Sequence, residues 1–288
     1  MSTLSDDIRG LLKRYKVQPT KKRGQSFLTN YAVAKEIVDF AELNKQDRVL
    51  EIGGGLGVLT QQIAEKAGEV HVVEIDANLV RALCDKVRDY NNVNIIEGDA
   101  LTVDLPKVNK IVSNLPYSIS SEITFRILQE LEYEMAVLMY QKEFASRLIA
   151  APGTPEYSRL SINVQYYARV EEVLEVPAEM FYPVPVVDSV VVRMVPRSAG
   201  PIARDHSVFH WMIAGIYPYP NKNLRRALRI WFRNLGLERT LADDALKRLD
   251  GLLSGEERLR SISLVTLVSL ADVILEFIES GAIADPRV

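Results

Sequence analysis

Short apolar runs and amphipathic segments alternate along the first half of the chain. Runs of four to six mainly apolar residues have the length of buried strands, and the segments between them repeat apolar residues three and four apart, as one side of a helix does. The expected strands are Arg48–Ile52, Val70–Ile75, Val93–Glu97, Lys110–Ser113 and Met135–Tyr140. The expected helices cover about Val58–Lys66 and Ala77–Arg88 and begin again near Ser120 and Lys142. This alternation predicts an α/β fold, a parallel sheet with helices on both faces.

Two longer β segments follow, Val164–Val176 and Val186–Val195, without a helical pattern between them. The proline-containing loop Phe181–Pro185 separates them. Two strands joined in this way favour an antiparallel hairpin at one edge of the sheet.

Beyond Pro196–Pro201, which is rich in helix-breaking residues, a helical pattern runs from about His206 to the end. A chain of 288 residues fits one large and one smaller domain. We therefore expect a larger α/β domain over residues 1–196 and a smaller all-helical domain over residues 197–288. Residues 1–25 are expected to form a basic, flexible N-terminal segment.

Composition places the chain among ordinary globular proteins, with 48% apolar and 25% charged residues. The valine-rich run Val186–Val195 contains Asp188 and Arg193, so we expect no membrane-spanning segment and no membrane partner. No apolar signal region is seen at the N-terminus. The single cysteine, Cys84, excludes an internal disulfide, and together these features predict a cytoplasmic protein.

The net charge of −3 conceals two basic stretches that contain no acidic residue. The first, between Leu11 and Gln25, holds Lys13, Arg14, Lys16, Lys21, Lys22 and Arg23; the second, between Asn221 and Asn234, holds Lys222, Arg225, Arg226, Arg229 and Arg233. On a helix the second set spans about 100° of arc, with Leu224, Ala227, Leu228 and Trp231 on the opposite side. Such a face can be merely solvated, but the absence of acids favours contact with nucleic-acid phosphates.

Candidate cofactor residues stand where successive strands end. A glycine loop, Gly53 to Gly57, follows the first strand and opens a helix, so its backbone can approach a ligand closely. Glu74 ends the second strand and can accept hydrogen bonds from ribose hydroxyls, and Asp99 follows the third and can accept one from an adenine amino group. Either acid can instead cap the following helix. With Asn114 ending the fourth strand, the series fits S-adenosylmethionine enzymes better than dehydrogenases.

The tetrapeptide Asn114-Leu115-Pro116-Tyr117 predicts the target site. A conjugated amine is a weak nucleophile, and the side-chain oxygen of Asn114 with the Leu115 carbonyl can hold its two N–H groups if Pro116 turns the chain suitably. Tyr117 offers a flat face for stacking on a base. The alternative is a strand-ending turn with a packed tyrosine. Phe181 is a candidate second aromatic wall, or an ordinary buried aromatic.

At this point the sequence resembles the ribosomal-RNA adenine N6,N6-dimethyltransferase family, in particular its small-subunit enzymes. The matching segments keep the family's order over about two-thirds of the chain: Gly24 to Leu28, Glu51 to Gly57, Glu74, Asp99, Asn114 to Tyr117 and Phe181 to Ser189. Two segments depart from the family pattern. Ser26 stands where the family has Asn or His. In addition, two prolines, Pro218 and Pro220, break the helix that in the family leads directly to the basic segment beginning here at Lys222.

The resemblance implies a Rossmann-like methyltransferase sheet with a helical C-terminal domain that grips ribosomal RNA. It implies that Ser26 and Leu28 join Gly53, Gly55, Glu74, Asp99 and Asn114 at the cofactor, S-adenosyl-L-methionine. The implied reaction dimethylates N6 of two adjacent adenosines in small-subunit (16S-type) rRNA, within an immature ribosomal subunit. We expect a monomer.

Two other functions remain open from the sequence. One is a large-subunit rRNA adenine methyltransferase of the macrolide-resistance type. The other is a non-catalytic RNA-binding assembly or transcription factor on the same fold, which the intact Asn114 to Tyr117 argues against. His206 and His210 have the spacing of a metal pair but lack a third ligand nearby in the sequence, so no metal is expected.

Overall fold

The computed structural model describes residues 4–19, 25–249 and 251–286. The chain forms two compact units, Met1–Ala145 with Ala168–Pro196, and Ser146–Tyr167 with Arg197–Val288. The boundary expected after Pro196 coincides with one of the points at which the chain passes from one unit to the other. Residues 146–167, which the sequence analysis placed in the first domain, pack instead with the second unit.

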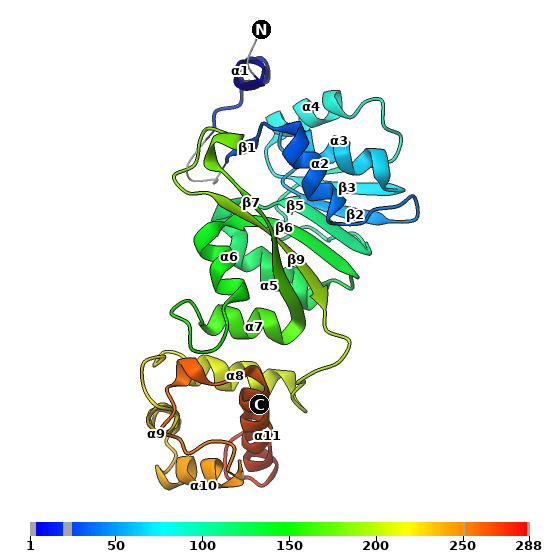
Figure 1. Ribbon diagram of the computed structural model, residues 1–288. Coiled ribbons are helices and arrows are strands. Elements are labelled where there is room, and N and C mark those ends of the chain that lie inside the picture. The colour runs from blue at the N-terminus through cyan, green and yellow to red at the C-terminus, as the bar shows by residue number, and fades with distance from the viewer. Residues whose placement is uncertain (1–3, 20–24, 250, 287–288) are drawn as a thin grey trace. The chain divides into compact units, whose positions relative to one another are not determined.

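The first unit contains the expected series of strands and helices (Figure 1). Its strands are β1 (Phe27–Leu28), β2 (Arg48–Ile52), β3 (Glu69–Glu74), β4 (Val93–Glu97), β5 (Lys110–Asn114), β6 (Met135–Gln141), β7 (Ala168–Val176), β8 (Phe181–Tyr182) and β9 (Ser189–Pro196). Its helices are α1 (Leu4–Arg14), α2 (Tyr31–Asp39), α3 (Val58–Lys66), α4 (Ala77–Lys86), α5 (Ser120–Glu130) and the first half of α6 (Lys142–Ile149), with short 3₁₀ helices η2 (Tyr117–Ile119) and η3 (Ala178–Met180).

Within the described residues, seven strands form one sheet in the order β4-β3-β2-β5-β6-β9-β7. The first five are parallel, and β9 and β7 add an antiparallel hairpin at one edge. The order reverses between β2 and β5, because β3 and β4 extend to one side and β6 to the other. In open α/β sheets a ligand site lies at such a switch point, outside the carboxyl ends of the strands.

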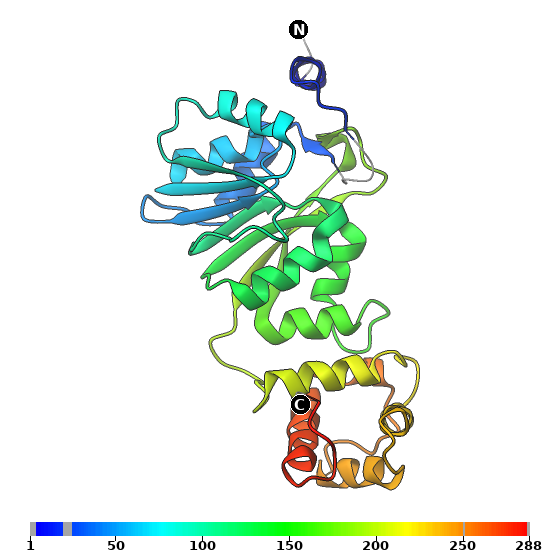
Figure 2. The same ribbon diagram turned by 180° about the vertical axis from the view of Figure 1, so that it is seen from behind.

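Helices cover both faces of this sheet, with α2, α3 and α4 on one side and α5 on the other (Figures 1 and 2). Alternate strand residues enter opposite layers of the core, as the two-residue period of a strand requires. Val49 of β2 packs with Ile37 of α2 and Ile63 of α3, all fully buried. The two-sided burial explains why the strands are almost continuously apolar.

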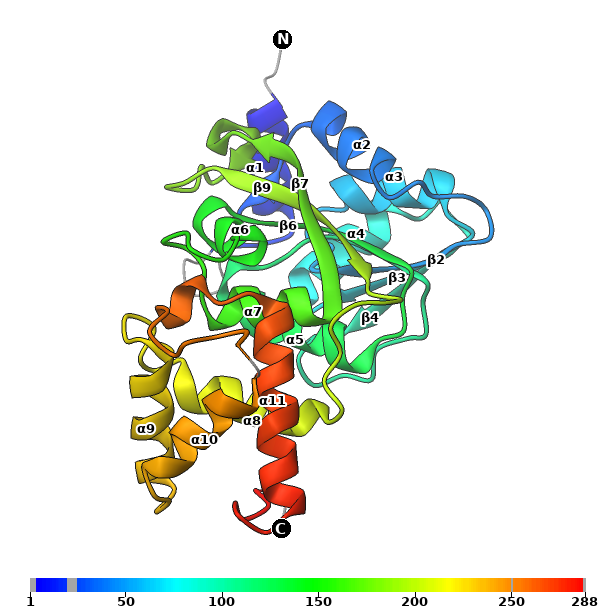
Figure 3. The same ribbon diagram turned by 60° about the horizontal axis from the view of Figure 1, so that its bottom comes forward.

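Strands β7 and β9 of the hairpin lie side by side at the edge of the sheet (Figure 3). The predicted strand Val164–Val176 is wrong in its first part, because Val164 to Tyr167 complete helix α7 (Arg159–Tyr167). Five successive residues from Leu160 are buried. A helix buried on most sides gives the same continuous apolar run as a buried strand, so periodicity did not separate the two.

The described part of the N-terminal segment, residues 4–19, packs on the first unit and does not form the flexible arm that its charge suggested. Ile8 and Leu12 of α1 and the following Val17 are buried in a small cluster with Phe27 and Leu79. Tyr15 packs against this cluster, and its hydroxyl donates a hydrogen bond of 2.6 Å to the Asp85 carboxylate on α4. Helix α1 is therefore held against the first unit by apolar packing and a charge-assisted hydrogen bond.

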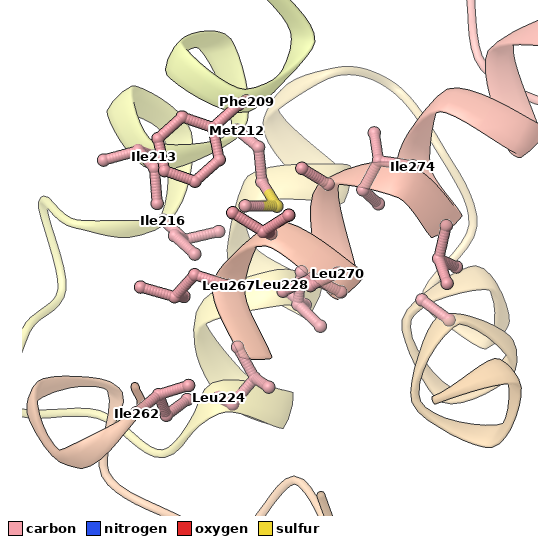
Figure 4. Packing of buried hydrophobic residues seen from close by; sticks show 14 of the residues in the cluster. Phe209, Met212, Ile213, Ile216, Leu224, Leu228, Ile262, Leu267, Leu270 and Ile274 are labelled. Atoms are coloured by element: carbon pink, nitrogen blue, oxygen red, sulfur yellow. The ribbon is translucent and has the colours of Figure 1, made fainter. Parts of the chain in front are cut away.

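The second unit is helical, as the pattern after Pro196 predicted. Its elements are α7 (Arg159–Tyr167), α8 (His206–Ile216), α9 (Leu224–Asn234), α10 (Thr240–Arg248), the 3₁₀ helix η4 (Leu259–Ser261) and α11 (Leu264–Glu279), together with the second half of α6. Figure 4 shows its core, where Met212 and Ile216 of α8 face Leu228 of α9 and Leu267 and Leu270 of α11. Among the described helices, none combines the length and apolar character needed to span a bilayer.

The two spaced histidines of α8 bond to tyrosines of α7. His206 Nδ1 lies 2.8 Å from the Tyr166 hydroxyl, and His210 Nε2 lies 2.7 Å from the Tyr167 hydroxyl. Burial lowers the pKa of His210 to about 4, so its ring is neutral at pH 7. These bonds attach α7 to α8 and account for its place in the second unit.

Candidate active site

A cavity of about 950 Å³ opens at the carboxyl ends of the parallel strands. Residues that end or follow β2, β3, β4 and β5 line it, among them Gly53, Glu74, Asp99 and Asn114. Its volume is near the upper end of the range of about 300–1,000 Å³ typical of ligand sites. The strand-end residues singled out from the sequence therefore share one cavity.

Two glycines of the loop after β2 stand in backbone conformations that other residues rarely adopt. Gly53 has φ 79°, and a Cβ there would lie 3.1 Å from the Pro116 ring. Gly55 has φ 55°, and a Cβ would lie 3.2 Å from the Phe27 ring. Glycine is required for the left-handed turn, and it lets this loop approach both the target tetrapeptide and the N-terminal segment.

Glu74 is turned toward the glycine loop. Its carboxylate accepts hydrogen bonds of 3.0 Å from the backbone N–H groups of Gly55 and Asp76, and the side chain is 5% exposed. Burial raises its pKa, while these two hydrogen bonds act in the opposite direction. The cap of α4 is Asp76, which accepts from Asn78 N. Glu74 is thus free of the capping role considered as its alternative, and each of its oxygens retains a lone pair for a ligand hydroxyl.

Asp99 forms a tight turn after β4. Its Oδ1 accepts from Leu101 N at 2.9 Å, and its carbonyl accepts from Val103 N at 2.9 Å. No helix follows among the described residues before β5, so this carboxylate closes a turn rather than capping a helix. It lines the cavity together with Ala100.

Asn114, at the end of β5, carries an unsatisfied acceptor. Its Oδ1 is buried and has no hydrogen-bond partner among the described residues, whereas its Nδ2 donates to the Ser26 carbonyl at 3.4 Å. Ser26 therefore meets the site through its backbone, and Leu28 lines the cavity beside it. Leaving a buried acceptor unpaired costs about 1–3 kcal/mol, which indicates that a ligand donor completes it.

The rest of the tetrapeptide also lines the cavity. The Leu115 N–H donates to the Met139 carbonyl at 3.4 Å, which ties the turn to β6, and Pro116 has φ −58° at its corner. Tyr117 is half-buried, and its hydroxyl lies 2.8 Å from that of Ser189. Burial raises the pKa of Tyr117, which keeps the hydroxyl protonated.

Phe181 does not stand in the cavity wall. It is 2% exposed, pairs with Leu28 across β8 and β1, and packs in the core of the first unit with Val176. The structure thus gives it the position of a buried aromatic, the alternative considered from the sequence. It acts on the site indirectly, since it holds the strand that carries Leu28.

Glu51 is a cavity residue that sequence reasoning passed over. It is 1% exposed, its Oε2 has no partner in the described part of the chain, and burial raises its pKa to about 8. Its signal was an acidic residue inside an otherwise apolar strand. With Asn114 Oδ1 it supplies a second buried acceptor, which suits a ligand that donates hydrogen bonds.

The second basic stretch divides into two groups. Arg225 and Arg229 form ion pairs with Asp243 of α10, and Arg225 also pairs with Glu256. Lys222, Arg226 and Arg233 are exposed and make no ion pair with other described residues. Lys222 precedes the helix, and the apolar face predicted for α9 is buried as expected. In the first stretch, Lys21, Lys22, Arg23 and Gly24 lie outside the described residues.

Comparison with known proteins places this site in a family. Residues 17–243 match the family described as ribosomal RNA adenine dimethylase. The chain is 43% identical over 221 residues to a probable ribosomal RNA small subunit methyltransferase A of Methanococcoides burtonii, covering 77% of this chain and 81% of the relative. It is 48% identical over 196 residues to the protein of the same name in Methanothermobacter thermautotrophicus, covering 68% and 71%.

Two solved structures share the fold over most of the chain. A dimethyladenosine transferase from Plasmodium falciparum superimposes with a TM-score of 0.77 at 29% identity, covering 88% of this chain and 97% of that one. The 23S rRNA methyltransferase ErmE superimposes with a TM-score of 0.66 at 26% identity, covering 86% and 98%. The family match spans the glycine loop, the strand-end acids and the tetrapeptide that line the cavity, and the chain therefore belongs to the ribosomal RNA adenine dimethylase family of methyltransferases.

Proposed function

We propose that this protein transfers methyl groups from S-adenosyl-L-methionine to N6 of two adjacent adenosines in small-subunit rRNA, within an immature ribosomal subunit. The observation that carries the proposal is the unpaired, buried Oδ1 of Asn114 in the cavity that also contains Glu74 and Asp99. An acceptor for the target amine and acceptors for the cofactor are thereby combined in one space. The relatives named as small-subunit methyltransferases support the choice of RNA.

The residues present fit this cofactor. It carries a sulfonium, an ammonium, two ribose hydroxyls and an adenine amino group, all cationic or hydrogen-bond donors. The cavity offers matching acceptors: the unpaired Glu51 Oε2, the Glu74 carboxylate and the Asp99 carboxylate. When bound, the cofactor supplies an electrophilic methyl group. Gly53 and Gly55, which cannot carry a Cβ here without crowding Pro116 or Phe27, leave room for its close approach.

The target side of the cavity is built from the tetrapeptide. Asn114 Oδ1 can accept one N–H of the adenine amine, and the carbonyl of Leu115, which also lines the cavity, can accept the other. Holding both N–H groups directs the nitrogen lone pair and stabilises the positive charge that develops on it. The exposed part of Tyr117 offers a ring face to the base. The methylated nitrogen is acidic enough to lose its proton to water, so no strong base is needed.

The second unit supplies the proposed grip on RNA. Lys222, Arg226 and Arg233 are exposed cations without a protein partner in the described chain, as contact with phosphates requires. This contact positions the RNA and does not read its sequence. We further propose that the protein acts as a monomer.

The test uses small subunits isolated in an under-methylated state, large subunits as the competing substrate, and cofactor labelled in its methyl group. We expect label on two adjacent small-subunit adenosines, as dimethyladenosine after nuclease digestion, and its initial rate of incorporation reduced by about 10²- to 10³-fold after Asn114→Ala. Asn94→Ala, which changes an exposed asparagine on β4, is the matched control and should remain active. Label confined to large-subunit RNA would favour the activity named for ErmE. Absence of label from both subunits would overturn the proposal.

A further inference from the structure

Arg126 of α5 reaches the turn that follows β4. Its Nη2 donates to the Val103 carbonyl at 2.8 Å, and its Nη1 donates to the Ala100 carbonyl. Its Nε donates to Glu130 at 2.7 Å, one turn further along α5. The side chain is 14% exposed. One guanidinium thus holds two carbonyls of a turn whose own residues are far from it in sequence.

That turn carries Asp99. The turn is closed by the bonds from Leu101 N and Val103 N to Asp99, and by packing so close that a Cβ at Gly98 would lie 2.4 Å from Val103 Cγ1. Asp99 Oδ1 is used inside the turn, and Oδ2 makes no hydrogen bond with the described residues. Ala100, whose carbonyl Arg126 holds, lines the cavity beside Asp99.

We propose that Arg126 is a positioning residue for the adenine end of the cofactor site. Hydrogen bonds from a charged guanidinium are stronger than neutral ones, and its planar fork fixes two acceptors in a set geometry. Fixing the Ala100 and Val103 carbonyls sets the orientation of the turn, and therefore the direction in which the free oxygen of Asp99 points. This inference rests on the proposed function, in which Asp99 accepts from the adenine amino group.

Helix α5, which carries Arg126, also follows the target tetrapeptide closely in the chain. Tyr117 opens η2, and α5 follows from Ser120 without a break. Arg126 therefore links the adenine-binding turn to the element that carries the target residues.

The experiment measures, by calorimetry, the affinity of the protein for S-adenosylhomocysteine and for S-inosylhomocysteine, in which a carbonyl replaces the amino group. The native protein should prefer the adenosyl compound. Arg126→Met should bind the adenosyl compound about tenfold more weakly, the order expected for one lost ligand hydrogen bond, and the inosyl compound almost as before. Glu130→Gln is the matched control, because it removes the ion pair on α5 and leaves both carbonyl contacts.

A purely structural role would weaken both ligands equally, and either that result or an unchanged preference would overturn the inference. If Arg126→Met does not fold, Arg126→Lys replaces it: lysine keeps the charge but lacks the fork, so the preference should be intermediate. A native protein that binds neither compound would instead refute the proposed function itself. A native protein that binds both equally would refute the role of Asp99 in adenine recognition and this inference with it.

Discussion

The hydroxyl of Tyr117 lies 2.8 Å from the hydroxyl of Ser189, 72 residues later in the chain. Ser189 is fully buried at the start of β9, where it pairs with Gln141 of β6 and Val176 of β7. The aromatic ring of the target tetrapeptide is thus fixed to the antiparallel part of the sheet. Asn114, three residues earlier, belongs to the parallel part. The target half of the cavity therefore depends on both parts of the sheet.

Tyr117→Phe should retain the ring but lose this hydrogen bond. We expect the free energy of unfolding to fall by about 0.5–1.5 kcal/mol, the usual net value of one hydrogen bond. Methyl transfer should fall several-fold, because the ring face is held less firmly. Tyr117→Ala should lose about 1–3 kcal/mol of stacking with the base, which corresponds to a reduction of roughly 5- to 150-fold in kcat/KM. Chemical denaturation and single-turnover kinetics measure the two effects.

Tyr140 provides the control for the hydroxyl. It is fully buried in β6, and its hydroxyl lies 2.7 Å from the Thr124 hydroxyl, away from the cavity wall. Tyr140→Phe should therefore destabilise the protein by a similar amount without a specific loss of transfer. Equal kinetic losses in Tyr117→Phe and Tyr140→Phe would show that the Ser189 contact has no role beyond stability.

Asn114→Ala should reduce single-turnover methyl transfer by about 10²- to 10³-fold, the range for removing one preorganised polar group from an active site. Removal of the unpaired Oδ1 favours the folded state, and removal of the hydrogen bond from Nδ2 to the Ser26 carbonyl disfavours it, so these opposed effects should change stability little. Cofactor affinity should fall only modestly. Activity close to that of the native protein would show that the tetrapeptide is a packed turn and not a target site.

The strands and helices of the first unit followed from periodicity because each apolar run there is bounded by glycine or polar residues. Periodicity failed at Val164 to Tyr167, where burial on most sides of α7 hides the helical repeat. Charge misled at α1, since apolar residues spaced four apart, Ile8 and Leu12, attach the helix despite its basic end. In each case contacts with distant elements decided the local structure.

The candidate site was predictable where the residues follow successive strands, since parallel strands bring their carboxyl ends to one edge. Phe181 could not be placed this way, because it belongs to a two-residue strand whose pairing with β1 depends on the whole fold. Arg126 belongs to no motif, and Ser189 only ends the matching segment Phe181 to Ser189. Their roles come from contacts across 23 to 26 residues and 72 residues, respectively. Long-range side-chain contacts of this kind leave no local signal.

The two groups of basic residues on α9 should respond differently to substitution. Arg226→Ala and Arg233→Ala should leave the unfolding free energy within about 0.5 kcal/mol of native, as exposed side chains usually do. Each should weaken binding to small-subunit RNA and lower the slope of log affinity against log salt by about 1. Filter binding at several salt concentrations measures this.

Arg225→Ala is the contrasting variant. It breaks ion pairs to Asp243 and Glu256 and a hydrogen bond to the Ser254 carbonyl, so it should lower the free energy of unfolding of the second unit more than Arg226→Ala does. Its salt slope should stay near the native value. An unchanged slope in Arg226→Ala, or an equal fall in Arg225→Ala, would contradict this division of the basic residues.

Glu51 should make stability depend on pH. Burial raises its pKa in the folded protein from the ordinary 4.5 to about 8, so between these values the folded protein holds a proton that the unfolded chain has released. The free energy of unfolding should therefore decrease as pH rises through this window. Glu51→Gln, which keeps the shape without the titrating group, should flatten the decrease and be more stable than the native protein at pH 8. Urea denaturation at several pH values measures both curves, with Glu97→Gln, an exposed carboxylate at the end of β4, as the control. A Glu51→Gln curve parallel to the native one would show that Glu51 is ionised in the folded protein. The cavity would then present a charged carboxylate to its ligand.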